Sequence, residues 1–327
     1  MKMGLVMKLA LAVIILFLFV GVVAPFVSSA YPLVITRNDT SLDLPTSPLL
    51  YAVFHKNDGG MDRIDFRKFS KEEQISAMYT LVPYSPYEKN LDEILFPPSL
   101  DRFGHYMGTD DVGRDIAARM VYGSRNSMMV GLVAMSIAVV IGLLVGSVAG
   151  YFGGWVDMVL SRLIEIVITF PRLILIMAVL TILKPSLFYV MIVIGVTGWT
   201  GIARIVRAEF LKRKTLEYVQ SARVQGASHM RIIWVHILPN SMAPVLVLIS
   251  FGIAGTVLLE SSLSFLGIGV QPPESSWGQI LDMSKAYMDF AWWLIFFPGF
   301  AIFLIVVSYN LLGDYIRRYL SPRERQN

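Results

Sequence analysis

The ionisable side chains between residues 105 and 119 are of the types that metal binding and acid–base chemistry use. His105, Asp110, Asp111, Arg114 and Asp115 all lie in this short stretch. Carboxylates and imidazoles bind divalent cations, so a metal site is one interpretation. The other is a set of Asp–Arg ion pairs that fixes the local loop. We favour the ion pairs.

The rest of the sequence offers no recognisable catalytic arrangement. No two of the four histidines, at positions 55, 105, 229 and 236, are spaced as a pair of metal ligands. Neither a Ser-His-Asp set nor a pair of carboxylates stands out, and there is no Gly-x-x-x-x-Gly-Lys-[Ser/Thr] phosphate loop. The sequence has no cysteine, which excludes disulfides and thiol chemistry. We therefore expect a non-catalytic protein with no metal or cofactor of its own, which argues against an intramembrane hydrolase.

A second set of residues, between 204 and 240, has a pattern suited to contact with another surface. It contains seven Lys and Arg residues. The spacing of one helix face recurs in Leu216, Val219, Arg223, Gly226 and Met230. Small residues at 221, 222, 226 and 227 would leave this helix flat enough for close approach, and Pro239 is predicted to end it. The opposing surface is either another protein or the lipid headgroups, which attract basic residues.

The elements that position these residues follow from composition. Hydrophobic residues make up 55% of the 327 residues and charged residues only 16%, against a usual charged share of about 25%. Disordered chains, basic nucleic-acid-binding proteins and ordinary cytosolic enzymes are excluded. No Asp, Glu, Lys or Arg occurs in the runs 9–36, 126–156, 185–203, 232–259 and 290–313. Each run can hold the roughly 20 helical residues that cross a bilayer core.

A sixth apolar stretch, 163–183, carries only Glu165 and Arg172. Backbone groups in lipid must form hydrogen bonds within their own segment, which favours helices. We therefore predict an all-α polytopic membrane protein with six transmembrane helices. The first lies within 1–30, the others lie at about 127–150, 160–183, 185–205, 240–260 and 290–313, and a tail over 315–327 follows.

Three charged residues, Glu165, Arg172 and Glu260, lie in these spans or at their ends. Such residues face a cavity or a partner by default. Glu165 and Arg172 are seven residues apart, so a continuous helix would place them on one face, as structural charges or as residues that line a pathway. Glu260 ends the fifth span, where it is either exposed to water or in contact with a neighbouring subunit or an outer gate.

The distribution of Lys and Arg predicts that both termini are cytoplasmic. The cytoplasmic pieces then hold 14 Lys and Arg, whereas the two short outer loops hold only Lys184 and Lys285, as the positive-inside rule requires. Two lysines before the first apolar run and small residues at 28 and 30 also fit a secretory signal peptide. We favour a retained helix, because the run reaches about Val27 and is long enough to span.

The polar segment 28–127 would then lie outside the membrane, with a net charge of −3. Segments of this length translocate largely regardless of their charge. Ser70 followed by Glu73 reads as a capping box and predicts a short helix over 71–79. Four prolines between 83 and 98 indicate irregular structure.

The segment from Gln220 to Pro239 resembles the cytoplasmic signature of ATP-binding-cassette (ABC) importer permeases. That signature reads Glu-Ala-Ala, three residues, Gly, nine residues, Ile-x-Leu-Pro. Here the corresponding stretch reads Gln220-Ser-Ala, three residues, Gly226, nine residues, His236-Ile-Leu-Pro239. The first two residues and His236 depart from the signature, whereas the following Ala, the Gly, the Leu and the Pro keep their places.

Other motifs resemble one branch of these permeases, the C-type subunit of dipeptide/oligopeptide importers. Gly108 to Asp115, with Arg119, resembles the segment before that family's second span, and 263–278 is similar to its loop between spans five and six. Trp292-Trp293, Pro298-Gly299 and 310–314 match its last span, and His236 is usual in this branch. The resemblance covers about 5–30 and 83–325. Residues 31–82 depart from it, because the family usually has a shorter connection there.

The resemblance implies a type I ABC importer permease fold in the cytoplasmic (inner) membrane, with an extracytoplasmic insert after helix 1. It implies a pore shared with a second, B-type permease subunit. It also implies two ATPase subunits, which bind ATP and Mg, and an extracytoplasmic substrate-binding protein. The helix around 216–230 is then expected to be the coupling helix that fits into an ATPase. We hypothesise that the insertion forms a lid or a docking surface outside.

Three sets of residues are expected to carry these contacts. Contact with the ATPase is expected from Glu217, Tyr218, Gln220, Ser221, Ala222, Gly226, Ala227, His236, Leu238 and Pro239. The extracytoplasmic signature consists of Gly108, Thr109, Asp110, Gly113, Arg114, Asp115 and Arg119. The outer loop between spans five and six contributes Glu260, Phe265, Gly267, Gln271, Pro272, Pro273, Trp277 and Gly278.

The sequence leaves the cargo open, since members of this family carry dipeptides, longer peptides, nickel complexes or oligosaccharides. A secondary transporter driven by an ion gradient is less favoured, because neither inverted repeats nor acidic relays within the spans stand out. A membrane sensor that uses 28–127 as its ligand domain would need a cytoplasmic signalling domain, and the stretch from Asp314 onward is too short for one.

Overall fold

The computed structural model describes residues 4–37, 47–49, 67, 75–101, 104–183 and 186–320. Most of the 31–82 insertion, Lys184 and the tail after Leu320 lie outside these residues. The chain divides into two compact units. The first comprises Met1–Ile14, Met129–Leu263 and Ile302–Asn327, and the second comprises Ile15–Met128 and Ser264–Ala301.

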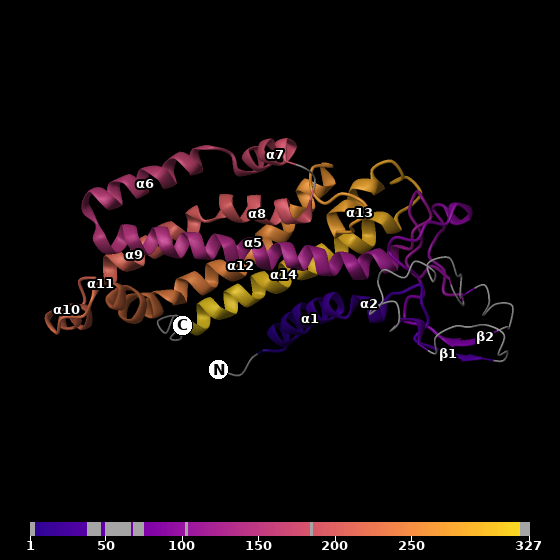
Figure 1. The fold of residues 1–327 in the computed structure, drawn as a ribbon, viewed down its shortest axis with the longest axis horizontal. Coiled ribbons are helices and arrows are strands. Elements are labelled where there is room, and N and C mark those ends of the chain that lie inside the picture. The colour runs from indigo at the N-terminus through magenta and orange to yellow at the C-terminus, as the bar shows by residue number, and fades with distance from the viewer. Residues whose placement is uncertain are drawn as a thin grey trace. The chain divides into compact units, whose positions relative to one another are not determined.

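The first unit consists of helices (Figure 1). In chain order these are the first part of α1 (Leu5–Val22), most of α5 (Ile116–Phe152), α6 (Gly154–Thr169), α7 (Arg172–Ile182), α8 (Leu187–Gly198), α9 (Thr200–Arg213), α10 (Glu217–Val224), α11 (His229–Arg231), α12 (Leu238–Phe265) and most of α14 (Trp293–Leu320). A π-helical turn, Ile232–Ile237, joins α11 to α12.

A row of glycines on α5 lets α9 approach closely. Gly142, Gly146 and Gly150 recur every four residues and so lie on one helix face. A Cβ atom at Gly146 would lie 2.5 Å from the carbonyl oxygen of Ala203 on α9. Small residues of this kind bring transmembrane helices together, because lipid provides no hydrophobic driving force for their association.

Five helices or helix runs among the described residues are long and apolar enough to cross a membrane. They are α1, α5, Leu187–Arg213, His229–Phe265 and α14. The pair α6 and α7 makes a sixth candidate, either as one broken span or as a re-entrant loop. These helices agree with the predicted six-span architecture.

The predicted span over 160–183 is not one continuous helix. The helix breaks between Thr169 and Arg172, and α6 and α7 meet at an angle of 81°. Pro171 explains the break, because proline lacks an N–H and disfavours helical geometry in the residue before it. Glu165 and Arg172 therefore lie on different helices, and the prediction that they share one helix face is wrong as well.

Pro239 does not end a helix, contrary to the prediction. It lies at the second position of α12, which follows the π-helical turn without a break. The proline ring crowds the carbonyl four residues earlier, and the wider π turn accommodates it. In that turn the Leu238 N–H donates to the carbonyl of Ile233, and the Asn240 side chain donates to the His236 carbonyl at 2.7 Å.

The second unit contains the later part of α1, α2 (Ala24–Val27), two strands, a 3-10 turn (Leu91–Glu93), the start of α5, α13 (Trp277–Ser284) and the start of α14. The strands β1 (Val34–Arg37) and β2 (Ile75–Met78) pair in antiparallel fashion, from Val34 opposite Met78 to Arg37 opposite Ile75. A small core of Val82, Ala117 and Ala118 packs with Tyr84 and Met107.

The helix predicted over 71–79 is wrong, because Ile75–Met78 is strand β2. Ser70 and Glu73, the two residues of the expected capping box, lie outside the described residues. The partner strand is rich in β-branched residues, which favour extended backbone. A local capping signal is worth only about 1 kcal/mol, and here the backbone instead pairs with a segment about forty residues earlier in the chain.

Candidate functional site

Helix α10 carries the first of the residues predicted to contact the ATPase. It is an eight-residue helix that lies beyond the end of α9 (Figure 1). One face is buried, because Val219 and Ala222 pack inward and α10 contacts the π-helical turn. The other face is not covered by the rest of the chain, and the exposed residues of α10 are Glu217, Tyr218, Gln220, Ser221, Arg223 and Val224. The helix is thus held on one side and available on the other.

Gly226 is required by the turn that ends α10. Its φ of +82° is left-handed, a conformation that costs an L-residue about 1–2 kcal/mol. The Gly226 N–H donates to the Arg223 carbonyl at 2.9 Å, and the Ala227 N–H donates to the Ala222 carbonyl at 3.0 Å. These two bonds form a Schellman motif. A Cβ atom at Gly226 would meet nothing within 4 Å, so the requirement is for backbone conformation.

The flat-face explanation for the small residues is therefore wrong at Ala222, and at Gly226 the backbone gives a separate reason for glycine. Gly226 is needed for its conformation, and the Ala222 side chain is buried against its own chain. Only Ser221 presents a small side chain on the exposed face of α10. Of the remaining predicted contact residues, Ala227, His236 and Leu238 are half-buried, and Pro239 is exposed.

Residues that the sequence reasoning missed tie this segment to the end of α5. The Tyr151 hydroxyl lies 2.7 Å from Nδ1 of His229, and the Arg223 guanidinium lies 5.4 Å from the centre of the Tyr151 ring. The Lys214 ammonium donates to the Gly150 carbonyl at 3.0 Å, and the Gln220 side chain donates to the Lys214 carbonyl at 3.0 Å. Apart from the local Gln220–Lys214 bond, these contacts join residues about 64 to 78 positions apart, so no local pattern could have indicated them.

The extracytoplasmic signature is organised around Asp110, whose side chain is fully buried. One carboxylate oxygen accepts the N–H groups of Val112 (3.0 Å) and Arg114 (2.9 Å). The other accepts Nε of Arg114 at 2.7 Å and also a guanidinium nitrogen of Arg119. Arg119 is 1% exposed and reaches on to the side-chain carbonyl of Gln279 on α13. Asp–Arg ion pairs thus fix this loop.

Asp115 caps the start of α5 and holds His105. One carboxylate oxygen accepts the Ala118 N–H at 2.6 Å, and the other lies 2.7 Å from Nδ1 of His105. Nε2 of His105 lies 3.0 Å from Glu93, and the imidazole stacks on Tyr84. Burial lowers the pKa of His105, but the bonds to Asp115 and Glu93 outweigh burial and leave the pKa above its ordinary value.

The remaining signature residues shape the backbone. Gly108 and Gly113 have φ angles of +78° and +74°, and a Cβ atom at Gly113 would overlap the carbonyl of Asn90. The Thr109 hydroxyl accepts the Phe96 N–H at 2.7 Å, and the Thr109 carbonyl accepts Nε1 of Trp293 at 3.1 Å. Glycine and threonine are therefore used here for close backbone approach.

The predicted loop between spans five and six divides into a buried and an exposed part. Trp277 is fully buried, and its Nε1 donates to the Met120 carbonyl at 3.2 Å; the neighbouring Gly278 is also buried. Gly267 has a φ of +77° and its carbonyl accepts the Gln271 side chain at 2.9 Å. The exposed residues of the predicted set are Phe265, Gly267, Pro272 and Pro273, and the two prolines are joined by a cis peptide bond.

Glu260 is fully buried within the chain. The alternative that it is exposed to water at the end of the fifth span is therefore wrong. Its carboxylate lies 3.5 Å from the hydroxyl of Ser261. The alternative that Glu260 contacts a neighbouring subunit or an outer gate stays a prediction.

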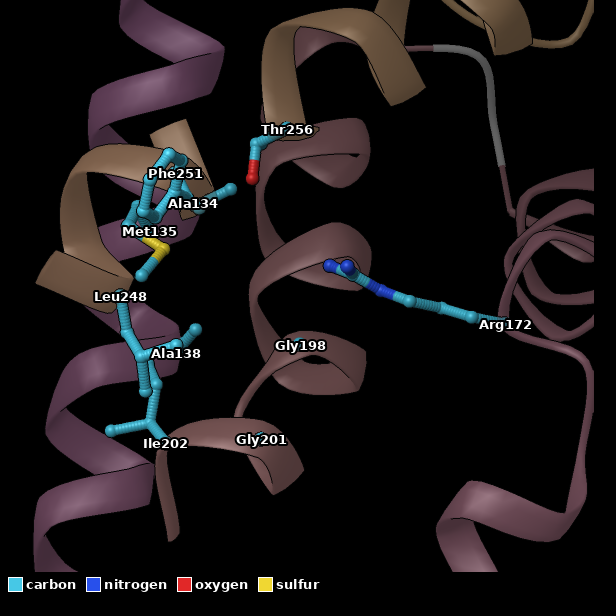
Figure 2. A pocket seen from close by; sticks show the side chains of 11 residues that line it. Ala134, Met135, Ala138, Arg172, Gly198, Gly201, Ile202, Leu248, Phe251 and Thr256 are labelled. Atoms are coloured by element: carbon cyan, nitrogen blue, oxygen red, sulfur yellow. The ribbon is translucent and has the colours of Figure 1, made fainter. Parts of the chain in front are cut away.

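Glu165 and Arg172 have different surroundings. Glu165 forms an exposed ion pair with Arg162 at 2.8 Å, one helical turn away. Arg172 instead donates to the Ile194 carbonyl on α8 at 2.9 Å and lines a cavity of about 300 Å³. Figure 2 shows its side chain extending from α7 toward Gly198. Of these two residues, only Arg172 therefore remains a candidate for lining the transport pathway.

The cavity is formed within the first unit by α5, α8, α9 and α12, with Arg172 from α7. Its lining consists of Ala134, Met135, Ala138, Arg172, Gly198, Gly201, Ile202, Leu248, Phe251, Gly252 and Thr256. Only Arg172 and Thr256 in this lining carry polar side chains. Among the residues that the structure describes, no group of three or more His, Asp or Glu side chains could hold a metal ion.

Comparisons with protein families and with curated proteins both match this chain to membrane components of transport systems. Residues 142–326 match the family described as binding-protein-dependent transport system inner membrane component. The chain is similar to the dipeptide transport system permease protein DppC of Alkalihalophilus pseudofirmus, with 39% identity over 76% of this chain and 81% of the relative. It is also similar to DppC of Haemophilus influenzae, with 35% identity over 88% of this chain and 100% of the relative.

A third relative is the oligopeptide transport system permease protein OppC of Haemophilus influenzae, which is 37% identical over 74% of this chain and 78% of the relative. Among solved structures, the inward-facing MetNI methionine ABC transporter contains a chain that matches with a TM-score of 0.50 and 20% identity. The match covers 62% of this chain and 95% of that one. At this identity the likeness shows the fold alone, which is that of type I ABC importer permeases.

Proposed function

Because the chain belongs to the family of inner-membrane components of binding-protein-dependent transport systems, we propose that it is the C-type permease subunit of an ATP-driven importer of dipeptides or oligopeptides. The names of its relatives, which are dipeptide and oligopeptide permeases, support this cargo. In the proposed assembly a B-type permease completes the pore, two ATPase subunits bind ATP and Mg, and an extracytoplasmic binding protein delivers the peptide.

The observation that carries the coupling role is the open face of α10. Between two long apolar helix runs, this short helix exposes Glu217, Tyr218 and Gln220 while Val219 holds it to the chain. The Schellman turn at Gly226 and the contacts of Tyr151 and Lys214 fix its position. A rigid helix that is open on one side suits transmission of movement from an ATPase to the spans.

The proposed orientation places α10 and both termini in the cytoplasm. It is supported by the Lys and Arg residues near α10 and after Asp314, since positively charged residues collect on the cytoplasmic side. We further propose that the insertion at 31–82 serves as a lid or docking surface outside. Uptake and binding-protein association that both survive deletion of 36–80 would contradict that role.

The coupling role is tested in proteoliposomes that contain the complete importer. Gly226→Trp should abolish uptake of a radiolabelled dipeptide and should uncouple ATP hydrolysis from the loaded binding protein. The physical reason is that a side chain at this left-handed position unwinds the turn that orients α10.

Gly154→Trp is the matched control. Gly154 also has a positive φ, +54°, and a Cβ atom there would also meet nothing within 4 Å, but this residue starts α6. Normal uptake by Gly226→Trp at normal membrane levels would contradict the coupling role. Absence of peptide uptake by the wild-type importer would contradict the cargo.

A further inference from the structure

Arg172 is a cation inside a candidate span without a carboxylate partner among the described residues. A guanidinium has five N–H donors, and one hydrogen bond holds it, to the carbonyl of Ile194. The neighbouring acidic residue, Glu165, pairs with Arg162 instead. Charged side chains within transmembrane segments are costly and mark functional sites by default. Arg172 therefore has free donor capacity for an anion.

The cavity gives that anion a place. Its volume of about 300 Å³ is at the lower end of the range for small-molecule sites. Its walls are mainly apolar, and Figure 2 shows Met135, Ile202 and Phe251 on the left of the view with Arg172 reaching in from the right. A few polar groups in an apolar cavity are the usual composition of a ligand site, because the apolar walls bury the ligand and the polar groups orient it.

Gly198 makes room for the Arg172 side chain. A Cβ atom at Gly198 would lie 2.6 Å from a guanidinium nitrogen of Arg172. Any larger residue at 198 would displace the guanidinium from its present position. Thr256 on α12 adds a hydroxyl to the same cavity, so that a cation and a hydrogen-bonding group line one space.

The depth of the cavity indicates which anion is relevant. Ala134, one of its lining residues, is the midpoint of α5, eighteen residues from either end. At 1.5 Å per residue this is about 27 Å along the helix from both ends. Gly198 and Gly201 likewise lie near the middle of the Leu187–Arg213 run. Lipid phosphates lie at the membrane surfaces, whereas a transported molecule passes the middle.

We propose that Arg172 binds the terminal carboxylate of the peptide during its passage, and so makes the permease itself selective for peptides with a free C-terminus. This inference rests on the proposed peptide cargo. Guanidinium and carboxylate match in charge and in bidentate geometry. The mainly apolar walls accept the side chains of the peptide with little regard to their identity.

The test measures equilibrium binding of radiolabelled dialanine and of dialanine amide to the complex of permease and ATPase subunits. The complex is held in nanodiscs of neutral lipid, and the binding protein is left out. Wild type should bind dialanine at least tenfold more tightly than the amide. Arg172→Gln should lose this preference, and Arg172→Lys should keep part of it, because a lysine retains the charge and loses the planar fork. Gly198→Ala should cause a smaller loss than Arg172→Gln.

The control is Arg162→Gln, which removes an exposed arginine on α6 and should leave both affinities unchanged. The proposal is overturned if wild type does not distinguish the two ligands, or if Arg172→Gln weakens both to the same extent. It is also overturned if wild type, but not Arg172→Gln, retains an anionic lipid after purification and that lipid blocks dialanine. Dipeptide uptake in proteoliposomes is measured in parallel, so that failure of the cargo itself is seen separately.

Discussion

The extracytoplasmic signature and the proposed coupling segment, residues 217–229, use polar side chains in opposite ways. In the signature, Asp110 and Arg119 are almost fully buried and bind each other and the neighbouring backbone. In the coupling segment, Glu217 and Gln220 lie exposed on α10, and only Val219 and Ala222 are inside. Buried charges hold a loop in one conformation, whereas exposed ones remain available to a partner. The contrast separates residues that maintain the fold from residues that can contact a partner.

The largest expected effect is at Asp110. Asp110→Ala would leave Arg114 and Arg119 buried without their carboxylate. Removing one partner of a buried ion pair lowers the free energy of unfolding by about 3–5 kcal/mol. We expect a strongly lowered melting temperature of the purified importer and a reduced amount in the membrane. Glu217→Ala is the control from the exposed segment and should leave the melting temperature unchanged. Equal melting temperatures for Asp110→Ala and wild type would remove the contrast between the two regions.

The next effect compares two left-handed glycines. Gly113→Ala combines the left-handed strain with overlap of the Asn90 carbonyl, whereas Gly226→Ala carries the strain alone, about 1–2 kcal/mol. Overpacking adds about 1–3 kcal/mol more at Gly113. Thermal unfolding of both variants measures the difference. A larger loss of stability at Gly226 would mean that the coupling turn is packed as tightly as the outer loop.

A smaller effect concerns pH. The pKa of His105 is raised by Asp115 and Glu93 in the folded protein. The stabilisation that the charged imidazole contributes is therefore fully present below its unfolded pKa, about 6.5, and is lost as pH rises through the raised value. Melting temperatures measured between pH 6 and pH 9 should fall for wild type by more than for His105→Gln. Parallel curves for the two proteins would exclude this role.

The smallest effect is at the contact between α5 and the coupling segment. Tyr151→Phe removes the hydroxyl that forms a hydrogen bond with His229. A single hydrogen bond contributes about 0.5–1.5 kcal/mol to the free energy of unfolding. We expect peptide transported per ATP hydrolysed to fall by a few-fold, while the melting temperature changes little. Tyr319→Phe, at an exposed ring near the end of α14, serves as the control. An unchanged transport ratio would mean that this bond plays no part in coupling.

The sequence indicated where the spans lie more reliably than how the loops between them fold. Uncharged runs located the apolar helices, but Pro171 broke one predicted span and Pro239 failed to break a helix. Both residues are prolines, so residue type alone was insufficient to predict where a helix breaks. The π-helical turn before Pro239 depends on how that segment packs. Spacing singled out Gly226, and the Schellman turn that requires a glycine there became visible only with the backbone angles.

The membrane-spanning character of this protein was determined by the sequence alone. Long apolar runs without charges can cross a bilayer as helices, because a helix forms all its backbone hydrogen bonds within its own segment. These bonds are local, so the sequence alone specifies them. The tertiary structure decided which charges meet. Arg119 joins Gln279, 160 residues away, and Arg172 enters a cavity with Gly198 beside it rather than sharing a helix face with Glu165. Such contacts depend on how helices distant in sequence pack, which no local pattern specifies.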